Sequence, residues 1–250
     1  MTDEARHTHD EPRIGAIVQA RMTSRRFPGK SLRPLCGKPM LQYVLESLGQ
    51  LDVLAETIVA TSIDPSDDPI AEFCEQFGWA CFRGPLDNVA ERFLQAAVAH
   101  DYSAFVRVSG DSPLLDPRLV ARGVALFAES GADLATNVFP RTYPAGMSVE
   151  VLRTETFERI VPTLADPGDR EHVTSYFYQH AERFRIVNFA LDAPRRDVHL
   201  AIDTPEQFEY VARIVGAMRR PHWEYSLEDV LRLCDKCSAD GMLAPSQVRP

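Results

Sequence analysis

The stretch RIGAIVQARMTSRRFPGKSLRPLCGKP, residues 13–39, places a short apolar run directly before a concentration of positive charge. Residues 13–20 form a nearly continuous apolar run with β-branched side chains, which predicts a buried strand of a parallel sheet. Residues 21–39 carry six lysine or arginine side chains and no carboxylate, in a chain whose formal net charge is -9. Such a stretch indicates either a solvated basic loop or a binding site for a strongly anionic ligand.

Segments of strand and helix character alternate after this first strand. Further strands are predicted over residues 56–62, 79–84 and 103–110, and helices over residues 39–51, 67–78, 87–100 and 117–130. Beyond residue 131 the pattern predicts strands over 133–139, 148–154 and 183–192, helices over 154–165 and 169–181, and a strand, loop and helix over 199–218. This alternation predicts an α/β fold, with a mainly parallel sheet and helices on both of its faces.

The composition is typical of one soluble globular domain, with 45% hydrophobic and 25% charged residues among 250. We expect a single domain over residues 13–235, a disordered N-terminal tail over 1–12 and a C-terminal tail over 236–250. The acidic balance argues against general nucleic-acid binding. No signal peptide and no apolar run of about 20 residues are found, so we expect a cytoplasmic protein without a membrane partner. Five scattered cysteines suggest no disulfide framework, and Cys234 and Cys237 are expected to be ordinary thiols.

Four motifs are expected at the carboxyl ends of predicted strands, where ligands of open parallel sheets bind. One of them, residues 139–151 together with 169–180, contains Arg141, Glu150, Arg170 and His172. Arg21, Arg26 and Lys30 lie in the basic loop, and Gly29 permits close approach of its backbone to a phosphate. Asp111 and Asp203 each follow an apolar strand, and together they could hold one Mg²⁺. For both aspartates the alternative is a turn or a helix cap.

The order and spacing of five motifs resemble the cytidylyltransferase-like family, which includes the CMP-sugar-acid synthetases. The motifs are IVQARMTSRRFPGKSLRPLCGKPMLQYV, RVSGDSPLLDP, RTYPAGMSVEV, REHVTSYFYQH and AIDTPEQFE. The likeness extends from about Ile14 to Met218 and is closest to the spore-coat polysaccharide (SpsF-type) branch. It implies a Rossmann-like nucleotidyltransferase fold of the nucleotide-diphospho-sugar transferase type, and a homodimer. The family pattern R-M-G-S-T-R has glycine and threonine where this chain has Thr23 and Arg25.

The resemblance also implies roles for individual residues. Arg21 and Lys30 would bind the nucleoside triphosphate, with Ser24 and Arg26 beside them, and Asp111 and Asp203 would bind magnesium. The expected catalytic residues are therefore Arg21, Lys30, Asp111 and Asp203. Candidates for reading the base are Ser62, Arg83 and Asp87, because they lie in or near the loops after the second and third strands. Candidates for the acceptor side are Arg141, Glu150, Arg170 and His172.

Residues and resemblance together predict a Mg²⁺-dependent nucleotidyltransferase. An oxygen of a sugar, sugar acid or sugar phosphate would attack the α-phosphorus of a nucleoside triphosphate and release pyrophosphate. CTP is favoured by the resemblance, as is a role in surface polysaccharide or glycoconjugate precursor synthesis. One alternative is a nucleotide-sugar-dependent glycosyltransferase, which does not need a triphosphate site at residues 21–30. The other is a non-catalytic nucleotide-sugar binding module, which would bind its ligand without releasing pyrophosphate.

Overall fold

The computed structural model describes residues 12–239, with side chains through Cys237. Of the tails predicted over residues 1–12 and 236–250, residues 1–11 and 240–250 lie outside the described residues. Helix α9 spans Leu227–Ala239, so the predicted boundary at residues 235 and 236 falls inside a helix. Its apolar face, including Cys234 and Cys237, packs into the core. No helix within residues 12–239 has both the length and the apolar character that a membrane crossing requires.

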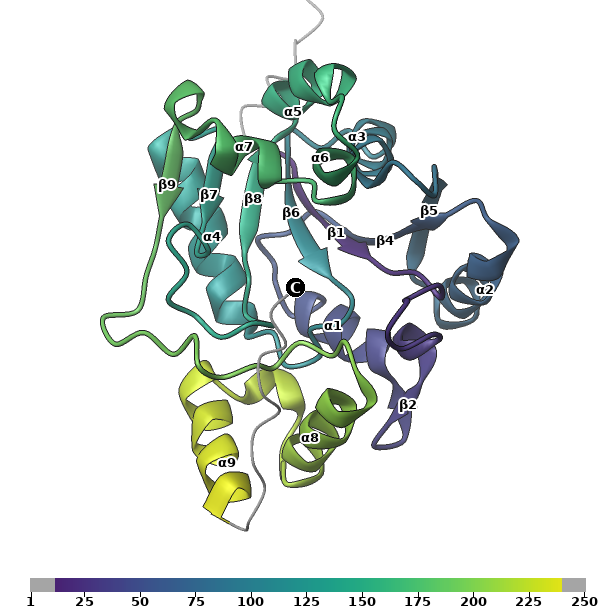
Figure 1. Ribbon diagram of the computed structural model, residues 1–250, viewed down its shortest axis with the longest axis vertical. Coiled ribbons are helices and arrows are strands. Elements are labelled where there is room, and N and C mark those ends of the chain that lie inside the picture. Colours follow the sequence, from purple (N-terminus) through teal and green to yellow (C-terminus); the bar gives the residue numbers. More distant parts are fainter. Residues whose placement is uncertain (1–11, 240–250) are drawn as a thin grey trace, which may run out of the picture.

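The sheet has seven strands within the described residues (Figure 1). They are β1 Ile14–Gln19, β4 Thr57–Ser62, β5 Ala80–Gly84, β6 Ala104–Ser109, β7 Leu134–Thr136, β8 Glu150–Arg153 and β9 Ile186–Asn188. Their order is β5-β4-β1-β6-β8-β7-β9. Every neighbouring pair is parallel except the two that β8 makes with β6 and β7. The prediction of a mainly parallel sheet is confirmed.

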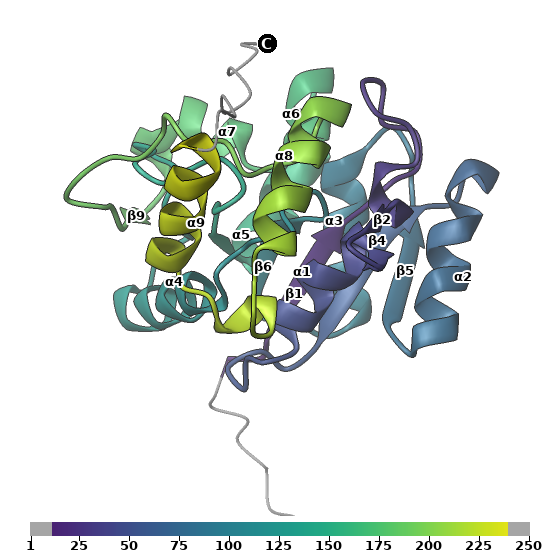
Figure 2. The same cartoon turned by 90° about the horizontal axis from the view of Figure 1, so that it is seen from below.

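Helices cover both faces of the sheet, as predicted. They are α1 Met40–Leu48, α2 Asp68–Phe77, α3 Val89–Ala99, α4 Pro117–Ser130, α5 Thr154–Ile160, α6 Pro167–Glu171, α7 Ser175–Gln179, α8 Pro205–Gly216 and α9. Successive residues of β1 point to opposite faces, so Ala16 and Val18 join one apolar core while Ile17 joins the other. The first core lies under α1, α2, α4, α8 and α9, and the second lies under α3, α5 and α7. Figure 2 shows α8 and α9 on the same side of the sheet as α1.

One predicted helix was wrong, and the basic stretch contains short elements that the sequence pattern did not predict. The basic stretch contains a 3₁₀ turn, η1 Lys30–Leu32, and a small hairpin of β2 Pro34–Leu35 with β3 Lys38–Pro39. The helix predicted over 169–181 is divided into α6 and α7. Helix α6 begins at Pro167, two residues before the predicted start, with Asp166 as its cap, and it ends before His172, whose backbone is not helical (φ −104°, ψ 62°). Asp169 accepts hydrogen bonds from Ser175 and Gln179, which connect α6 to α7.

The strand predicted to lead into Asp203 is also absent. Residues 199–203 form one isolated bridge, between Ala145 and His199. The Leu200 amide donates to the Ala145 carbonyl at 2.8 Å, and the Ile202 amide donates to the Asp111 carbonyl at 2.9 Å. The segment therefore pairs with loops rather than with the sheet, and this pairing brings Asp203 beside Asp111.

Candidate active site

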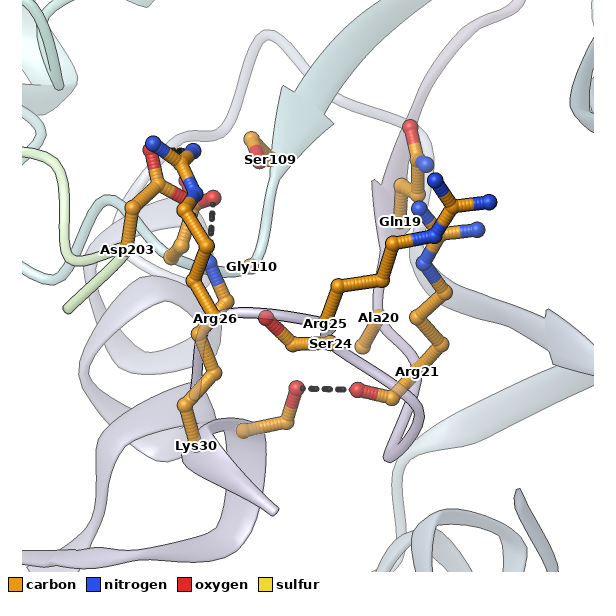
Figure 3. A pocket seen from close by; sticks show the side chains of 12 residues that line it. Gln19, Ala20, Arg21, Ser24, Arg25, Arg26, Lys30, Ser109, Gly110 and Asp203 are labelled. Atoms are coloured by element: carbon orange, nitrogen blue, oxygen red, sulfur yellow. Dashed lines mark hydrogen bonds and ion pairs between the residues drawn. The ribbon is translucent and has the colours of Figure 1, made fainter. Parts of the chain in front are cut away.

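A cavity of about 270 Å³ opens at the carboxyl ends of β1 and β6 (Figure 3). Its lining includes six of the residues that the sequence predicts for the site: Arg21, Ser24, Arg26, Lys30, Asp111 and Asp203. The basic loop thus faces the two aspartates across one cavity, which we call the first cavity. Lys30 is buried, which argues against the interpretation of this stretch as a solvated basic loop.

Lys30 connects the basic loop to both aspartates. Its side chain is buried, and its Nζ donates to the Ile202 carbonyl at 2.6 Å, to Asp203 Oδ1 at 2.8 Å and to Asp111 Oδ2 at 3.0 Å. These bonds use all three donors of the ammonium group. The two carboxylates therefore converge on a single cation.

Asp203 is held in its charged form. Burial would raise the pKa of its carboxyl, but the charge and hydrogen bond of Lys30 and the charge of Arg26 together keep that pKa below its ordinary value. Arg26 contacts Asp203 Oδ2 at 2.9 Å. At neutral pH this end of the first cavity therefore presents an ionised carboxylate that is paired with protein cations.

A buried carboxylate, that of Asp67, accepts a hydrogen bond from the basic loop. Asp67 is fully buried and accepts a hydrogen bond from the Met22 amide at 2.7 Å and from the Ser62 hydroxyl at 2.5 Å. Within the loop, the Gly29 amide donates to the Met22 carbonyl at 2.9 Å. Gly29 has a φ of 73°, in the left-handed region that favours glycine. The loop is therefore a fixed structure, tied to the start of α2.

Thr23 and Arg25, which depart from the family pattern, do not adopt the left-handed backbone conformation that favours glycine. Among the described residues other than glycine, only Cys36 and Asp101 have a positive φ. Arg25 lines the first cavity. In Figure 3 its guanidinium lies on the same side as that of Arg21, whereas the guanidinium of Arg26 lies beside Asp203.

Arg21 meets a residue that the sequence did not single out. Its Nη2 lies 2.6 Å from Oε1 of Glu171 in α6. The sequence analysis named its two neighbours, Arg170 and His172, as acceptor-side candidates. Both are exposed, and Arg170 donates to the Leu164 carbonyl. Adjacent residues of a helix point about 100° apart, so only one of the three can face the loop.

The residues predicted to read the base make contacts within the protein. Ser62 is buried and bonds Asp67. Arg83 donates to the Ser62 carbonyl at 2.9 Å and pairs with Asp68 at 2.6 Å. Asp87 is exposed. None of the three lines the first cavity, and their role at the base stays a prediction.

A second cavity, of about 210 Å³, adjoins the first and shares Ser109, Asp111 and Asp203 with it. Two predicted acceptor residues, Arg141 and Glu150, line this second cavity. Arg107 and His199 line it as well, although no sequence motif pointed to either residue. Both come to this position through pairing with distant segments of the chain.

Charge in the second cavity is largely balanced inside the protein. Glu150 is buried and accepts hydrogen bonds from Arg107 and from the Tyr178 hydroxyl, each at 2.5 Å. Burial alone would raise the pKa of Glu150, but the charge of Arg107 and these bonds hold it below its ordinary value. Glu150 therefore neutralises Arg107, and Arg141 is left as the other cation of this cavity.

Arg141 and His199 each have a buried atom that lacks a partner. Arg141 Nη2 donates to the Ser148 hydroxyl at 3.0 Å, but its Nη1 has no hydrogen-bond partner among the described residues. The same holds for His199 Nε2. Burial lowers the pKa of His199, so its ring is neutral at pH 7. A buried polar atom without a partner is costly, and a bound ligand can supply the missing bond.

The donor set fits a hard divalent cation. No group of three or more His, Cys, Asp or Glu side chains within residues 12–239 could hold a metal by itself. Mg²⁺ binds through one or two carboxylates and completes its shell with water and phosphate oxygens, so Asp111 and Asp203 suffice for it. The same two carboxylates already bind one cation together, because both accept a hydrogen bond from Lys30 Nζ.

Comparisons with known proteins identify the family. A sequence profile of the cytidylyltransferase family matches residues 15–235. The spore coat polysaccharide biosynthesis protein SpsF of Bacillus subtilis is 32% identical over 78% of this chain and 83% of its own. The 3-deoxy-manno-octulosonate cytidylyltransferase of Geobacter sulfurreducens is 36% identical, over 48% of this chain and 47% of its own.

A solved cytidylyltransferase from Leptospira borgpetersenii superposes with a TM-score of 0.87, at 28% identity, over 92% of this chain and 96% of its own. The fold is thus the nucleotide-diphospho-sugar transferase fold, as the resemblance implied. The extent of the profile match and of this superposition leads to one conclusion: the chain belongs to the cytidylyltransferase family and is a nucleotidyltransferase.

Proposed function

We propose that the protein transfers CMP from CTP to a hydroxyl of a sugar acid, in a Mg²⁺-dependent reaction that releases pyrophosphate. The observation that supports this most directly is the convergence of Lys30, Asp111 and Asp203 at one end of a cavity lined by arginines. CTP as the donor rests on the family and on the activity named for the Geobacter relative. The likeness to SpsF supports a role in precursor synthesis for surface polysaccharide.

The basic loop binds the triphosphate in this proposal. Lys30, Arg21 and Arg26 supply positive charge to the phosphate oxygens, and Ser24 lies among them. Charge accumulates on the leaving pyrophosphate as its bond to the α-phosphorus breaks. Fixed cations that meet this charge lower the barrier without reorganising during the reaction. Because Asp67 and Gly29 fix the loop, these cations are held ready in advance.

Asp111 and Asp203 would hold Mg²⁺. When bound, the ion supplies charge neutralisation at the α-phosphate and lowers the pKa of an attacking hydroxyl. The two residues also lie on the boundary between the cavities, which is where donor and acceptor have to meet.

The second cavity binds the acceptor. Arg141 Nη1, buried and without a partner among the described residues, suits one carboxylate oxygen of a sugar acid. Arg107 is already paired with Glu150, so the cavity offers little charge for a phosphate dianion. His199 is neutral and can accept a hydrogen bond from an acceptor hydroxyl through Nε2.

Pyrophosphate release tests the proposal. The four common nucleoside triphosphates are each combined with sugar acids, sugar phosphates and sugar phosphonates in the presence of Mg²⁺. We expect release with CTP and a sugar acid. Transfer from a nucleotide sugar without pyrophosphate would favour a glycosyltransferase, and ligand binding without release from any pair would favour a non-catalytic module. Release with sugar phosphates alone would contradict the acceptor assignment.

The proposal includes a homodimer in the cytoplasm, where nucleoside triphosphates are abundant. Light scattering coupled to gel filtration measures the oligomeric state, and a mass near 28 kDa would contradict the dimer. Cell fractionation with a tagged chain tests the location.

A further inference from the structure

Lys30 lies where the two metal-binding candidates would meet a cation. Its ammonium bonds Asp111 Oδ2 and Asp203 Oδ1 at once, and the Ile202 carbonyl takes its third donor. The side chain is 10% exposed, so water does not replace these bonds cheaply. Among the described residues, no other side chain is bonded to both carboxylates.

The remaining carboxylate oxygens are engaged more loosely. Asp203 Oδ2 contacts Arg26, whose side chain is 54% exposed, and Asp111 Oδ1 accepts from the neighbouring Ser112 hydroxyl at 3.2 Å. Exposed ion pairs exchange readily with water and contribute little free energy. A divalent cation could therefore displace Arg26 easily, whereas Lys30 stands between the two oxygens that the cation needs.

The positive charge of Lys30 also opposes the binding of a second cation to the two carboxylates. A buried ammonium within about 3 Å of both carboxylates cancels part of their attraction for a second cation and repels it directly. The same ammonium belongs to the loop that is proposed to bind phosphate. A triphosphate would offer Lys30 anionic oxygens in place of the carboxylates, and the carboxylates would then be free to bind a metal.

We propose that Lys30 acts as an internal counter-ion that keeps divalent cations off Asp111 and Asp203 until a triphosphate takes over its ammonium group. The inference rests on the proposed function, because it takes the two carboxylates as the metal site and the basic loop as the triphosphate site. It goes beyond that function in one respect. Metal and nucleotide would bind together. The triphosphate draws Lys30 away from the carboxylates that the metal needs, and the metal draws the carboxylates away from the Lys30 that the triphosphate needs.

The test measures metal binding without any nucleotide. The full-length chain is titrated with Mn²⁺, and the free hydrated ion is followed by electron paramagnetic resonance. Wild-type protein should bind Mn²⁺ weakly, and Lys30→Met should bind it on the order of a hundredfold more tightly, because a nearby positive charge has been removed. Lys30→Gln provides a second variant that keeps hydrogen-bonding capacity without charge, and circular dichroism checks that each variant is folded.

Two controls identify the site. Lys38→Met removes another ion-paired lysine, one that pairs with Glu46 and lies outside the first cavity, and it should leave Mn²⁺ binding unchanged. Adding Asp111→Asn to Lys30→Met should abolish the gain. In the wild-type protein, CTP should increase the amount of bound Mn²⁺ beyond what CTP alone binds in solution.

Three results would overturn the inference: tight Mn²⁺ binding by the wild type without nucleotide, no gain in either folded Lys30 variant, or a gain that survives Asp111→Asn. None of these measurements involves turnover. Pyrophosphate release by the wild-type enzyme is scored separately, so the inference can fail while the proposed function stands, and the reverse can be recognised as well.

Discussion

Arg21 and Glu171 lie 150 positions apart in the chain and form an ion pair of 2.6 Å that joins the basic loop to α6. About a third of each side chain is exposed, so the pair adds little to stability, typically less than about 1 kcal/mol. Its importance is local. The guanidinium proposed to bind the triphosphate is occupied by a protein carboxylate, and an incoming phosphate must compete with that carboxylate.

Replacing Glu171 should therefore strengthen nucleotide binding. We expect Glu171→Gln to tighten CTP binding by about two- to tenfold, the range of a partly screened charge pair. Calorimetric titration with CTP measures the change. Glu155→Gln, which breaks the exposed pair with Arg159, is the matched control and should have no effect. Equal or weaker binding in Glu171→Gln would show that Glu171 does not compete for Arg21.

Removing the charge of Asp67 should loosen the basic loop. Its carboxylate is fully buried and accepts from Met22 and Ser62, so we expect Asp67→Asn to lower the free energy of unfolding by about 1–3 kcal/mol. The KM for CTP should rise more than kcat falls. Urea unfolding and steady-state kinetics measure the two effects. Asp64→Asn changes a half-buried cap residue whose replacement can still accept from the Ser66 amide, so it should change neither. An unaltered KM in Asp67→Asn would rule out a positioning role.

Asp111 should matter for turnover more than for nucleotide affinity. Loss of a charge-stabilising group commonly reduces turnover on the order of 10²-fold or more, so we expect that loss for Asp111→Asn while CTP still binds. Pyrophosphate release and equilibrium binding separate the two quantities. Unchanged turnover would remove Asp111 from the metal role.

In the same assays, unaltered affinity and turnover in Lys30→Ala would favour the solvated-loop interpretation of residues 21–39.

Arg141 should affect the acceptor alone. Because its free Nη1 lies in the wall of the second cavity, we expect Arg141→Met to raise the acceptor KM by about tenfold or more and to leave the KM for CTP unchanged. Arg159→Met removes an arginine of a mostly exposed pair and serves as the control. If both substrates lose affinity equally, Arg141 supports the fold rather than the acceptor.

Protonation of Glu150 at low pH should lower the free energy of unfolding. The pKa of this carboxyl is held below its ordinary value of 4.5, so its stabilising effect is fully present above that value. It is lost as the pH falls through the lower pKa of the folded state. The free energy of unfolding, measured from pH 6 to pH 3, should decline less steeply in Glu150→Gln than in the wild type. Identical slopes would contradict the assignment.

The sequence predicts the first cavity well for a physical reason. Parallel strands end at the same edge of the sheet, so a residue that follows β1 and one that follows β6 must lie close together. The order of apolar runs therefore predicts that the basic loop and Asp111 lie at one edge of the sheet, whereas the roles proposed for Lys30 and Asp111 come from the family resemblance. Asp203 reaches the same place by a different route, because its segment pairs with loops, and the strand predicted there does not form.

Other site residues depend on contacts that no local pattern records. Glu171 is the last residue of α6 and faces Arg21, while one predicted helix is broken directly after it at His172. His199 lines the second cavity because its backbone bridges to Ala145, where Gly146 has a φ of 92° and an added Cβ would meet the backbone of Leu200 at 2.7 Å. These arrangements are tertiary, and periodicity and motif spacing carry no information about them.

The antiparallel strand β8 separates the sheet into an early part and a late part. Every residue that lines only the first cavity falls between positions 19 and 110, whereas Arg141, Glu150 and His199 of the second come from the later part. The second cavity also uses Arg107 of β6, so substitutions confined to residues 141–199 would reshape one wall of the proposed acceptor site and leave the basic loop unchanged. Under the proposed roles of the two cavities, that wall could change its acceptor while the triphosphate site stays the same.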